Sequence, residues 1–137
     1  MKKAIIDSGV WIALKHKGDQ YNEKAEEITR AWQNNTIKEA YITNYILLET
    51  ANFLLRKTTF EVTLDAIKML TESARIKVRY VDEFMHFRII QLFQKYKEMS
   101  LADCSLLALA EEEGISHIFS FDSAFDRVNG VSRKENV

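Results

Sequence analysis

Residues 3–14 read KAIIDSGVWIAL, and this segment predicts the first two elements of the fold. Residues 3–7 form a short apolar run that ends in an acid, which is typical of a buried strand. Ser8 can cap a helix that starts at Gly9, because a serine oxygen accepts hydrogen bonds from the free amides of a first helical turn. The stretch therefore predicts a strand followed at once by a helix, with Asp7 at the junction.

The rest of the chain continues this alternation of strand and helix. Further strands are expected over residues 40–43, 76–81 and 117–121. Helices are expected over residues 21–33, 44–57 with Asn44 as its cap, 60–72, 84–93 and 100–114, and a helical turn over residues 122–128. Strands separated by such helices pair in parallel through right-handed crossovers. We therefore expect an α/β fold, a three-layer α/β/α sandwich with a short central parallel sheet.

Composition limits the possible classes of protein. The 137 residues, 47% of them hydrophobic, suit one core, so we expect a single domain over residues 1–137. A formal net charge of -1 argues against a general polyanion binder, so any nucleic-acid site must be local. The single cysteine, Cys104, excludes an internal disulfide. Without a membrane-length apolar run or a signal peptide, we expect a cytoplasmic protein that does not contact a membrane.

Four acids occupy positions at which parallel sheets bind ligands, namely Asp7, Glu49, Asp103 and Asp122. Asp7 and Asp122 are expected to close the first and fourth strands. Ligands of such sheets bind outside the carboxyl ends of the strands. We expect all four acids to lie among apolar residues and to converge. Carboxylates about 5 Å apart repel by roughly 3 kcal/mol at an effective dielectric near 20, so a divalent cation is needed.

The ligand types indicate which cation this is. Carboxylate oxygens favour Mg²⁺ or Mn²⁺. Zinc is not indicated, because His16, His86 and His117 share no ligand spacing. The sequence leaves open whether one or two ions bind.

Three blocks of the chain resemble the successive blocks of PIN domains: residues 3–14, residues 42–55 (ITNYILLETANFLL) and residues 101–128 (LADCSLLALAEEEGISHIFSFDSAFDRV). The resemblance covers essentially the whole chain, and the short length is similar to the VapC-like toxin branch. It implies that Asp7, Glu49, Asp103 and Asp122 are the catalytic metal ligands. Many relatives carry a further acid where this chain has Ala124, so the second metal is in doubt unless Asp126 contributes.

The resemblance also implies a function. It predicts an Mg²⁺- or Mn²⁺-dependent endoribonuclease that hydrolyses RNA phosphodiester bonds, the toxin of a toxin–antitoxin pair held inactive by a small antitoxin protein. A homodimer is expected through the helix of residues 46–55 or that of residues 84–93. Two alternatives stay open, a housekeeping RNA-processing PIN nuclease and a catalytically silent PIN-like binding module. Residues expected to orient the carboxylates are Ser8, Thr43, Asn44 and Ser120.

Contacts with RNA are expected from local cations and aromatic rings. The available cations are Arg56, Lys57, Arg79, Arg88, Lys95 and Lys97. Unpaired bases stack on exposed aromatic rings, for which Trp11, Tyr45 and Phe125 are candidates, although such residues more often belong to a core.

Other folds with an acid after the first strand fit less well. A signalling receiver domain usually needs paired acids there and a Lys-Pro after its last strand, whereas this chain has only Asp7 and no proline. A phosphatase of the Asp-x-Asp kind would need an acid at Gly9.

Overall fold

The computed structural model describes residues 2–137, and its centre is a five-stranded parallel sheet. The strands are β1 (Lys3–Ile6), β2 (Glu39–Thr43), β3 (Ile76–Arg79), β4 (His117–Phe119) and β5 (Ser132–Lys134), in the order β3-β2-β1-β4-β5. Ile5 of β1 lies opposite Tyr41 of β2 on one side and Ile118 of β4 on the other. The expected α/β fold with a parallel sheet is confirmed.

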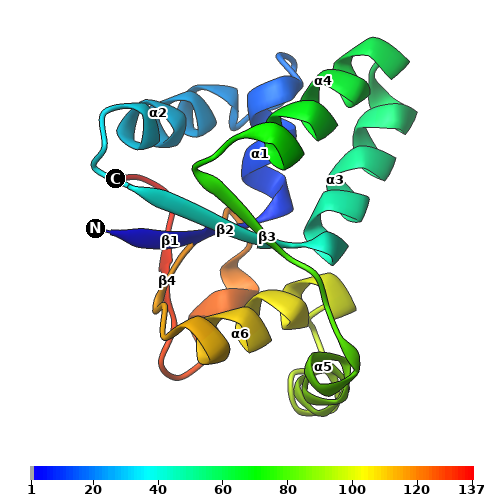
Figure 1. The fold of residues 1–137 in the computed structure, drawn as a ribbon, viewed down its shortest axis with the longest axis vertical. Coiled ribbons are helices and arrows are strands. Elements are labelled where there is room, and N and C mark those ends of the chain that lie inside the picture. Colours follow the sequence, from blue (N-terminus) through cyan, green and yellow to red (C-terminus); the bar gives the residue numbers. More distant parts are fainter. Residues whose placement is uncertain (1) are drawn as a thin grey trace.

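Helices cover both faces of the sheet, as Figure 1 shows. One face carries α1 (Ser8–Lys15), α2 (Asn22–Gln33), α3 (Asn44–Lys57) and α4 (Phe60–Glu72), and the other carries α5 (Glu83–Lys95) and α6 (Leu101–Glu113). A short 3-10 helix, η1 (Ser123–Arg127), follows β4. Within residues 2–137, no helix is both long and apolar enough to cross a membrane.

The core lies between the sheet and its helices. β1 is buried from Ala4 to Ile6, and α6 is buried from Asp103 to Ala110. A helix that is buried on all sides must be apolar all round, which explains the run of leucine and alanine in α6. Cys104 lies in this run as a buried free thiol, and burial followed by the nearby Asp103 charge raises its pKa to about 11.

The structure corrects two expected helix caps. Asp7, not Ser8, caps α1, because its carboxylate accepts a 2.7 Å hydrogen bond from the backbone amide of Ser8. Thr43, not Asn44, caps α3 through a 3.3 Å bond from the amide of Ile46. The side chain of Asn44 instead accepts a hydrogen bond from the amide of Val81.

Strand boundaries also differ from the sequence prediction. β3 and β4 end two residues earlier than expected, at Arg79 and Phe119. Asp122 therefore lies three residues beyond β4 instead of closing it. β5 was not expected at all. It lies at the edge of the sheet beside β4, and its three polar residues carry no apolar alternation.

Candidate active site

The carboxyl ends of β1 and β4 lead to a cleft of about 440 Å³. All four acids singled out from the sequence line it, and each comes from a different part of the fold. Among the described residues, no lysine, arginine or histidine lines the cleft. The lining residues are Asp7, Ser8, Gly9, Ile12, Asp19, Gln20, Tyr21, Glu49, Phe53, Ser100, Asp103, Phe121 and Asp122.

Asp7 is the most deeply placed acid, with 5% of its surface exposed. Its backbone amide donates to the carbonyl of Phe119 at 2.9 Å, which continues the pairing of β1 with β4. One carboxylate oxygen accepts from the amide of Ser8 and the other from the hydroxyl of Ser120, each at 2.7 Å. Burial, followed by the charge of Asp103, raises the pKa of Asp7 to about 7, although both hydrogen bonds oppose that rise.

Asp103 is buried in the first turn of α6 and takes part in a capping box with Ser100. The amide of Ser100 donates to Oδ2 of Asp103, and the amide of Asp103 donates to Oγ of Ser100, both at 3.0 Å. Burial, with a smaller effect of the Asp122 charge, raises the pKa of Asp103. No described residue donates a hydrogen bond to Oδ1 of Asp103, so that oxygen is available to a ligand.

Glu49 and Asp122 are exposed at the mouth of the cleft. The expectation that all four acids lie among apolar residues is wrong for these two, because both side chains are exposed. Leu48, beside Glu49 on α3, is itself 60% exposed. Partial burial, followed by the charges of Asp103 and Asp122, raises the pKa of Glu49. Asp122 caps η1 through a 2.9 Å bond from the amide of Ala124.

The residues expected to orient the carboxylates divide into two groups. Ser8 and Ser120 contact Asp7 directly. The Thr43 hydroxyl has no hydrogen bond to a carboxylate among the described residues. It lies 2.7 Å from that of Ser105, so it joins the start of α3 to α6, the helices that carry Glu49 and Asp103. Asn44 binds the amide of Val81, and Asp126 is held by Arg133 at 2.9 and 3.1 Å outside the cleft.

The lining residues that the sequence did not single out include Asp19, Tyr21 and Phe121. The rings of Tyr21 and Phe121 stack with their centroids 4.4 Å apart and their planes 13° from parallel. Asp19 accepts a 2.8 Å bond from the amide of Tyr21, which fixes the loop between α1 and α2. We call Tyr21 and Phe121 the aromatic rim of the cleft.

The candidate RNA contacts need correction. Trp11 and Phe125 are buried, 2% and 0% exposed, and cannot stack on a base. The indole of Trp11 instead donates to the carbonyl of Ile6. Two of the expected cations are engaged elsewhere, Arg79 with Asp82 and Glu112 and Arg88 with Glu111.

The donor set of the cleft fits a divalent cation. Every acid in it offers oxygen ligands. Burial, followed by the repulsion between the acids, raises the pKa values of Asp7 and Glu49, and a bound cation relieves that repulsion. Within residues 2–137, no three potential ligands stand close enough together to form a finished coordination shell. Glu49 and Asp122 are exposed, and exposed side chains change rotamer freely.

A sequence model of the PIN domain matches residues 4–131. The chain belongs to the PIN-domain family. Solved structures share this PIN fold. The VapC20 toxin of Mycobacterium tuberculosis, described as cleaving the sarcin–ricin loop, matches with a TM-score of 0.78 and 21% identity over 88% of this chain and 90% of its own.

Two further structures have the same fold over nearly their whole length. A toxin–antitoxin complex from Klebsiella pneumoniae gives a TM-score of 0.68 at 19% identity, covering 94% of this chain and 95% of that one. VapBC2 from Rickettsia felis, bound to a fragment of promoter DNA, gives a TM-score of 0.70 at 10% identity. The match covers 96% of this chain and 97% of that one. A sequence search of the curated proteins gave no match. The PIN fold is thus shared at low sequence identity.

Proposed function

We propose that this PIN domain, formed by residues 1–137, is a metal-dependent endoribonuclease that hydrolyses RNA phosphodiester bonds. One observation carries the proposal: the four predicted acids, which come from separate elements, and Asp19 line one cleft in which no described cation offsets them. A cleft lined by carboxylates attracts divalent cations. A phosphodiester is negatively charged and is repelled by such a cleft unless cations offset the charge of the carboxylates. Membership of the PIN-domain family supports the proposal.

The four acids take distinct roles in this proposal. Asp7, Glu49 and Asp103 hold the first Mg²⁺ or Mn²⁺, and Asp122 completes that shell or orients the attacking water. When bound, the cation lowers the pKa of water and offsets the charge that builds up on the phosphate. Ser8 and Ser120 fix both oxygens of Asp7. With Ala124 in place of a further acid and Asp126 held by Arg133, the site favours one ion over two.

The experiment is cleavage of a broad panel of single-stranded and structured RNAs by the purified full chain. Activity is expected with Mn²⁺ or Mg²⁺ and not with EDTA, and Asp7→Asn and Glu49→Gln should abolish it. Glu72→Gln removes an exposed acid on α4 and is the matched control. The proposal fails if no RNA is cleaved, or if Asp7→Asn cleaves as the parent does.

We further propose that the enzyme is a cytoplasmic toxin inhibited by a small antitoxin protein that covers the acidic cleft. The support is that its structural relatives include a protein described as a toxin and two toxin–antitoxin assemblies. Expression of the chain in bacteria should arrest growth, and Asp7→Asn should relieve the arrest. An active nuclease with harmless expression favours the housekeeping alternative. A chain that binds no divalent cation favours the binding module.

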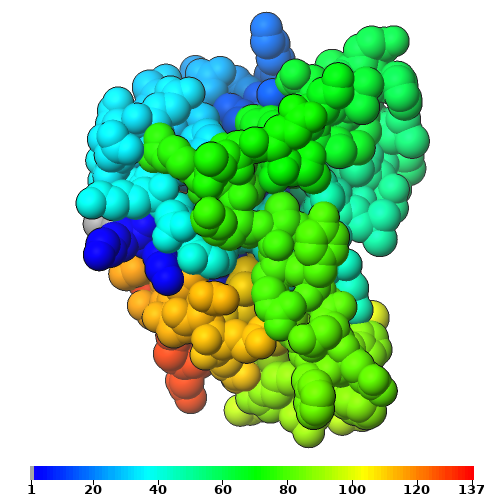
Figure 2. All heavy atoms as spheres, in the orientation of Figure 1, coloured from blue at the N-terminus to red at the C-terminus, as the bar shows by residue number. Residues whose placement is uncertain are grey.

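A homodimer is the third part of the proposal. Tyr45 and Leu48 of α3, Phe93 of α5 and Leu101 of α6 line an apolar groove of about 570 Å³. Figure 2 shows the surface hollowed at the edge between α3 and α5. An exposed apolar groove is a candidate interaction site. Sedimentation equilibrium should give a dimer that Leu48→Glu converts to monomer, and a parent chain that is already monomeric contradicts this.

A further inference from the structure

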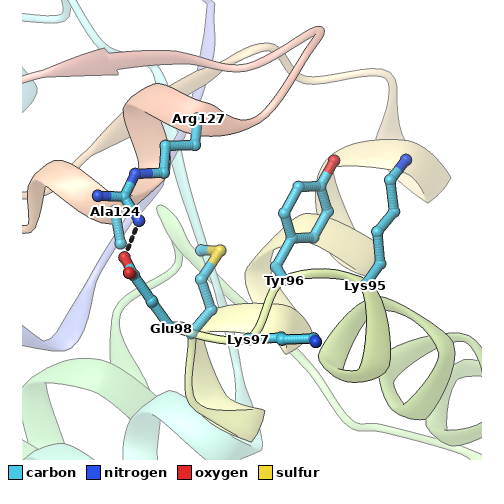
Figure 3. Close-up of a pocket in the computed structure, with 7 residues that line it drawn as sticks. Lys95, Tyr96, Lys97, Glu98, Ala124 and Arg127 are labelled. Atoms are coloured by element: carbon cyan, nitrogen blue, oxygen red, sulfur yellow. Dashed lines mark ion pairs between the residues drawn. The ribbon is translucent and has the colours of Figure 1, made fainter.

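A second pocket, of opposite charge, adjoins the acidic cleft. It has a volume of about 260 Å³ and lies between η1 and the loop that joins α5 to α6 (Figure 3). Three cations and one carboxylate line it, whereas all charged lining residues of the acidic cleft are acids. We call it the basic pocket, and its lining residues are Lys95, Tyr96, Lys97, Glu98, Met99, Ala124 and Arg127.

Two separate chain segments pass from the basic pocket into the acidic cleft. Met99 lines the pocket, and the next residue, Ser100, lines the cleft. Asp122 lines the cleft, and Ala124 lines the pocket. Two residues of extended chain span at most about 7 Å, so the backbone of Asp122 lies within that distance of the pocket wall. The two sites therefore adjoin and can contact one extended ligand.

Lys95 and Lys97 are available to a ligand. Among residues 2–137, no carboxylate lies within ion-pair distance of either, whereas Arg88 is paired with Glu111. Lys95 holds its ammonium 5.3 Å from the centre of the Tyr96 ring. Figure 3 shows Lys95 and Tyr96 on one side of the pocket and Arg127 on the other, in an ion pair with Glu98.

We propose that the basic pocket binds a backbone phosphate of the RNA beside the bond that is cut. This inference rests on the proposed ribonuclease function and names how its substrate is held. Lys95 and Lys97 supply charge, and the planar guanidinium of Arg127 can bind a phosphate through two parallel hydrogen bonds. The pocket explains how a chain of net charge -1 with an acidic centre attracts a polyanion locally.

Glu98 gives the proposal a second consequence. It pairs with Arg127, so it competes with an incoming phosphate for the guanidinium. A neutral amide at this position removes the competitor and leaves the three cations in place. Glu98→Gln should therefore tighten RNA binding, which is a gain that impaired folding does not produce.

The test is fluorescence anisotropy of a labelled single-stranded RNA of about 20 nucleotides, in EDTA, over about 50 to 300 mM salt. The double variant Lys95→Gln/Lys97→Gln should bind the RNA on the order of tenfold or more weakly at low salt. The logarithm of the association constant should also fall less steeply with the logarithm of the salt concentration, with a slope smaller in magnitude by about 1.4. Glu98→Gln should bind more tightly than the parent. Matched controls for charge are Lys38→Gln/Lys68→Gln and Glu72→Gln, which alter exposed residues outside the pocket.

Several outcomes overturn the basic pocket as a phosphate site. One is a lysine double variant whose salt slope equals that of the parent, and another is an equal loss of RNA affinity in its lysine control. Weaker RNA binding by Glu98→Gln, or tighter binding of a polyglutamate peptide than of RNA by the parent, has the same consequence. The cleavage assay separates this inference from the proposed function. If RNA binds as expected but is not cleaved with Mg²⁺ or Mn²⁺, the proposed nuclease activity is overturned. If RNA is cleaved but the variants keep the salt slope of the parent, only the phosphate-binding role of the pocket is overturned.

Discussion

The hydroxyl of Ser120 donates a 2.7 Å hydrogen bond to Oδ2 of Asp7 and so joins the loop after β4 to the end of β1. The two strands are neighbours at the point where the strand order reverses, which is where open parallel sheets bind ligands. The backbone amide of Ser8 binds the other oxygen of Asp7. These two hydrogen bonds therefore orient the Asp7 carboxylate in the metal-free protein.

Ser120→Ala should weaken metal binding and stability together. It leaves a buried carboxylate oxygen without its donor, which costs about 1 to 3 kcal/mol in the free energy of unfolding. Loss of the group that orients a metal ligand typically lowers metal affinity by about 10- to 100-fold. Urea denaturation and a Mn²⁺ titration of RNA cleavage measure the two effects.

Thr63→Ala is the control, because it removes another buried hydroxyl, which donates to the carbonyl of Thr59 and does not line the cleft. It should lower stability with little change in the Mn²⁺ requirement. Equal Mn²⁺ requirements for the parent and Ser120→Ala would contradict the role given to Ser120.

Stability of the metal-free protein should fall as pH rises. The pKa of Asp7 is raised from 3.8 to about 7, so between these values the folded chain holds a proton that the unfolded chain has lost. The free energy of unfolding therefore decreases through this window, by at most roughly 4 kcal/mol, and levels off above about pH 7. Urea denaturation in EDTA at a series of pH values measures it.

Asp7→Asn should flatten this pH dependence and stabilise the metal-free chain at high pH, because asparagine carries no charge and still caps a helix. The difference between the two stability curves isolates Asp7 from the other titrating groups. Parallel curves would show that Asp7 ionises as readily in the folded chain as in the unfolded one.

The aromatic rim should bind unpaired bases. Phe121→Ala removes a ring at the edge of the cleft, and base stacking is worth about 1 to 3 kcal/mol per base. We expect the KM for single-stranded RNA to rise roughly tenfold or more, with kcat little changed. Steady-state kinetics on a single-stranded substrate measures both constants.

Phe84→Ala on α5 is the control, because its ring is 88% exposed and does not line the cleft. Tyr21→Phe should behave as the parent, since it keeps the stacked ring. A rise in KM for Phe84→Ala as large as that for Phe121→Ala would refute a specific role for the rim.

The acids could be predicted because their positions follow from local sequence. Asp7 ends an apolar run, and Asp103 opens an apolar helix, so the sequence alone predicts that both lie at the end of a strand or the start of a helix. The exposure of Glu49 could not be predicted in this way, since its apolar neighbour Leu48 suggests burial and is itself exposed. Apolar neighbours indicate burial only when another element covers them, and the groove beside Leu48 stays uncovered in this chain.

The aromatic rim and β5 depended on tertiary packing. Tyr21 lies in a loop, and nothing local shows that it meets Phe121, 100 positions later in the chain. β5 has three polar residues and pairs with one neighbour, so no apolar pattern distinguishes it from a loop. Conversely, the positions of Trp11 and Phe125 in the sequence suggest rings that stack on bases, whereas both side chains are buried in the core.

Direct measurement of Mn²⁺ binding by electron paramagnetic resonance tests the central claim, that the four carboxylates hold a divalent cation. Free Mn²⁺ is measured against the full chain near neutral pH. The account predicts saturable binding that is lost in Asp7→Asn and in Asp103→Asn and kept in Glu72→Gln. Binding that survives Asp7→Asn unchanged, or no binding by the parent chain, would contradict it.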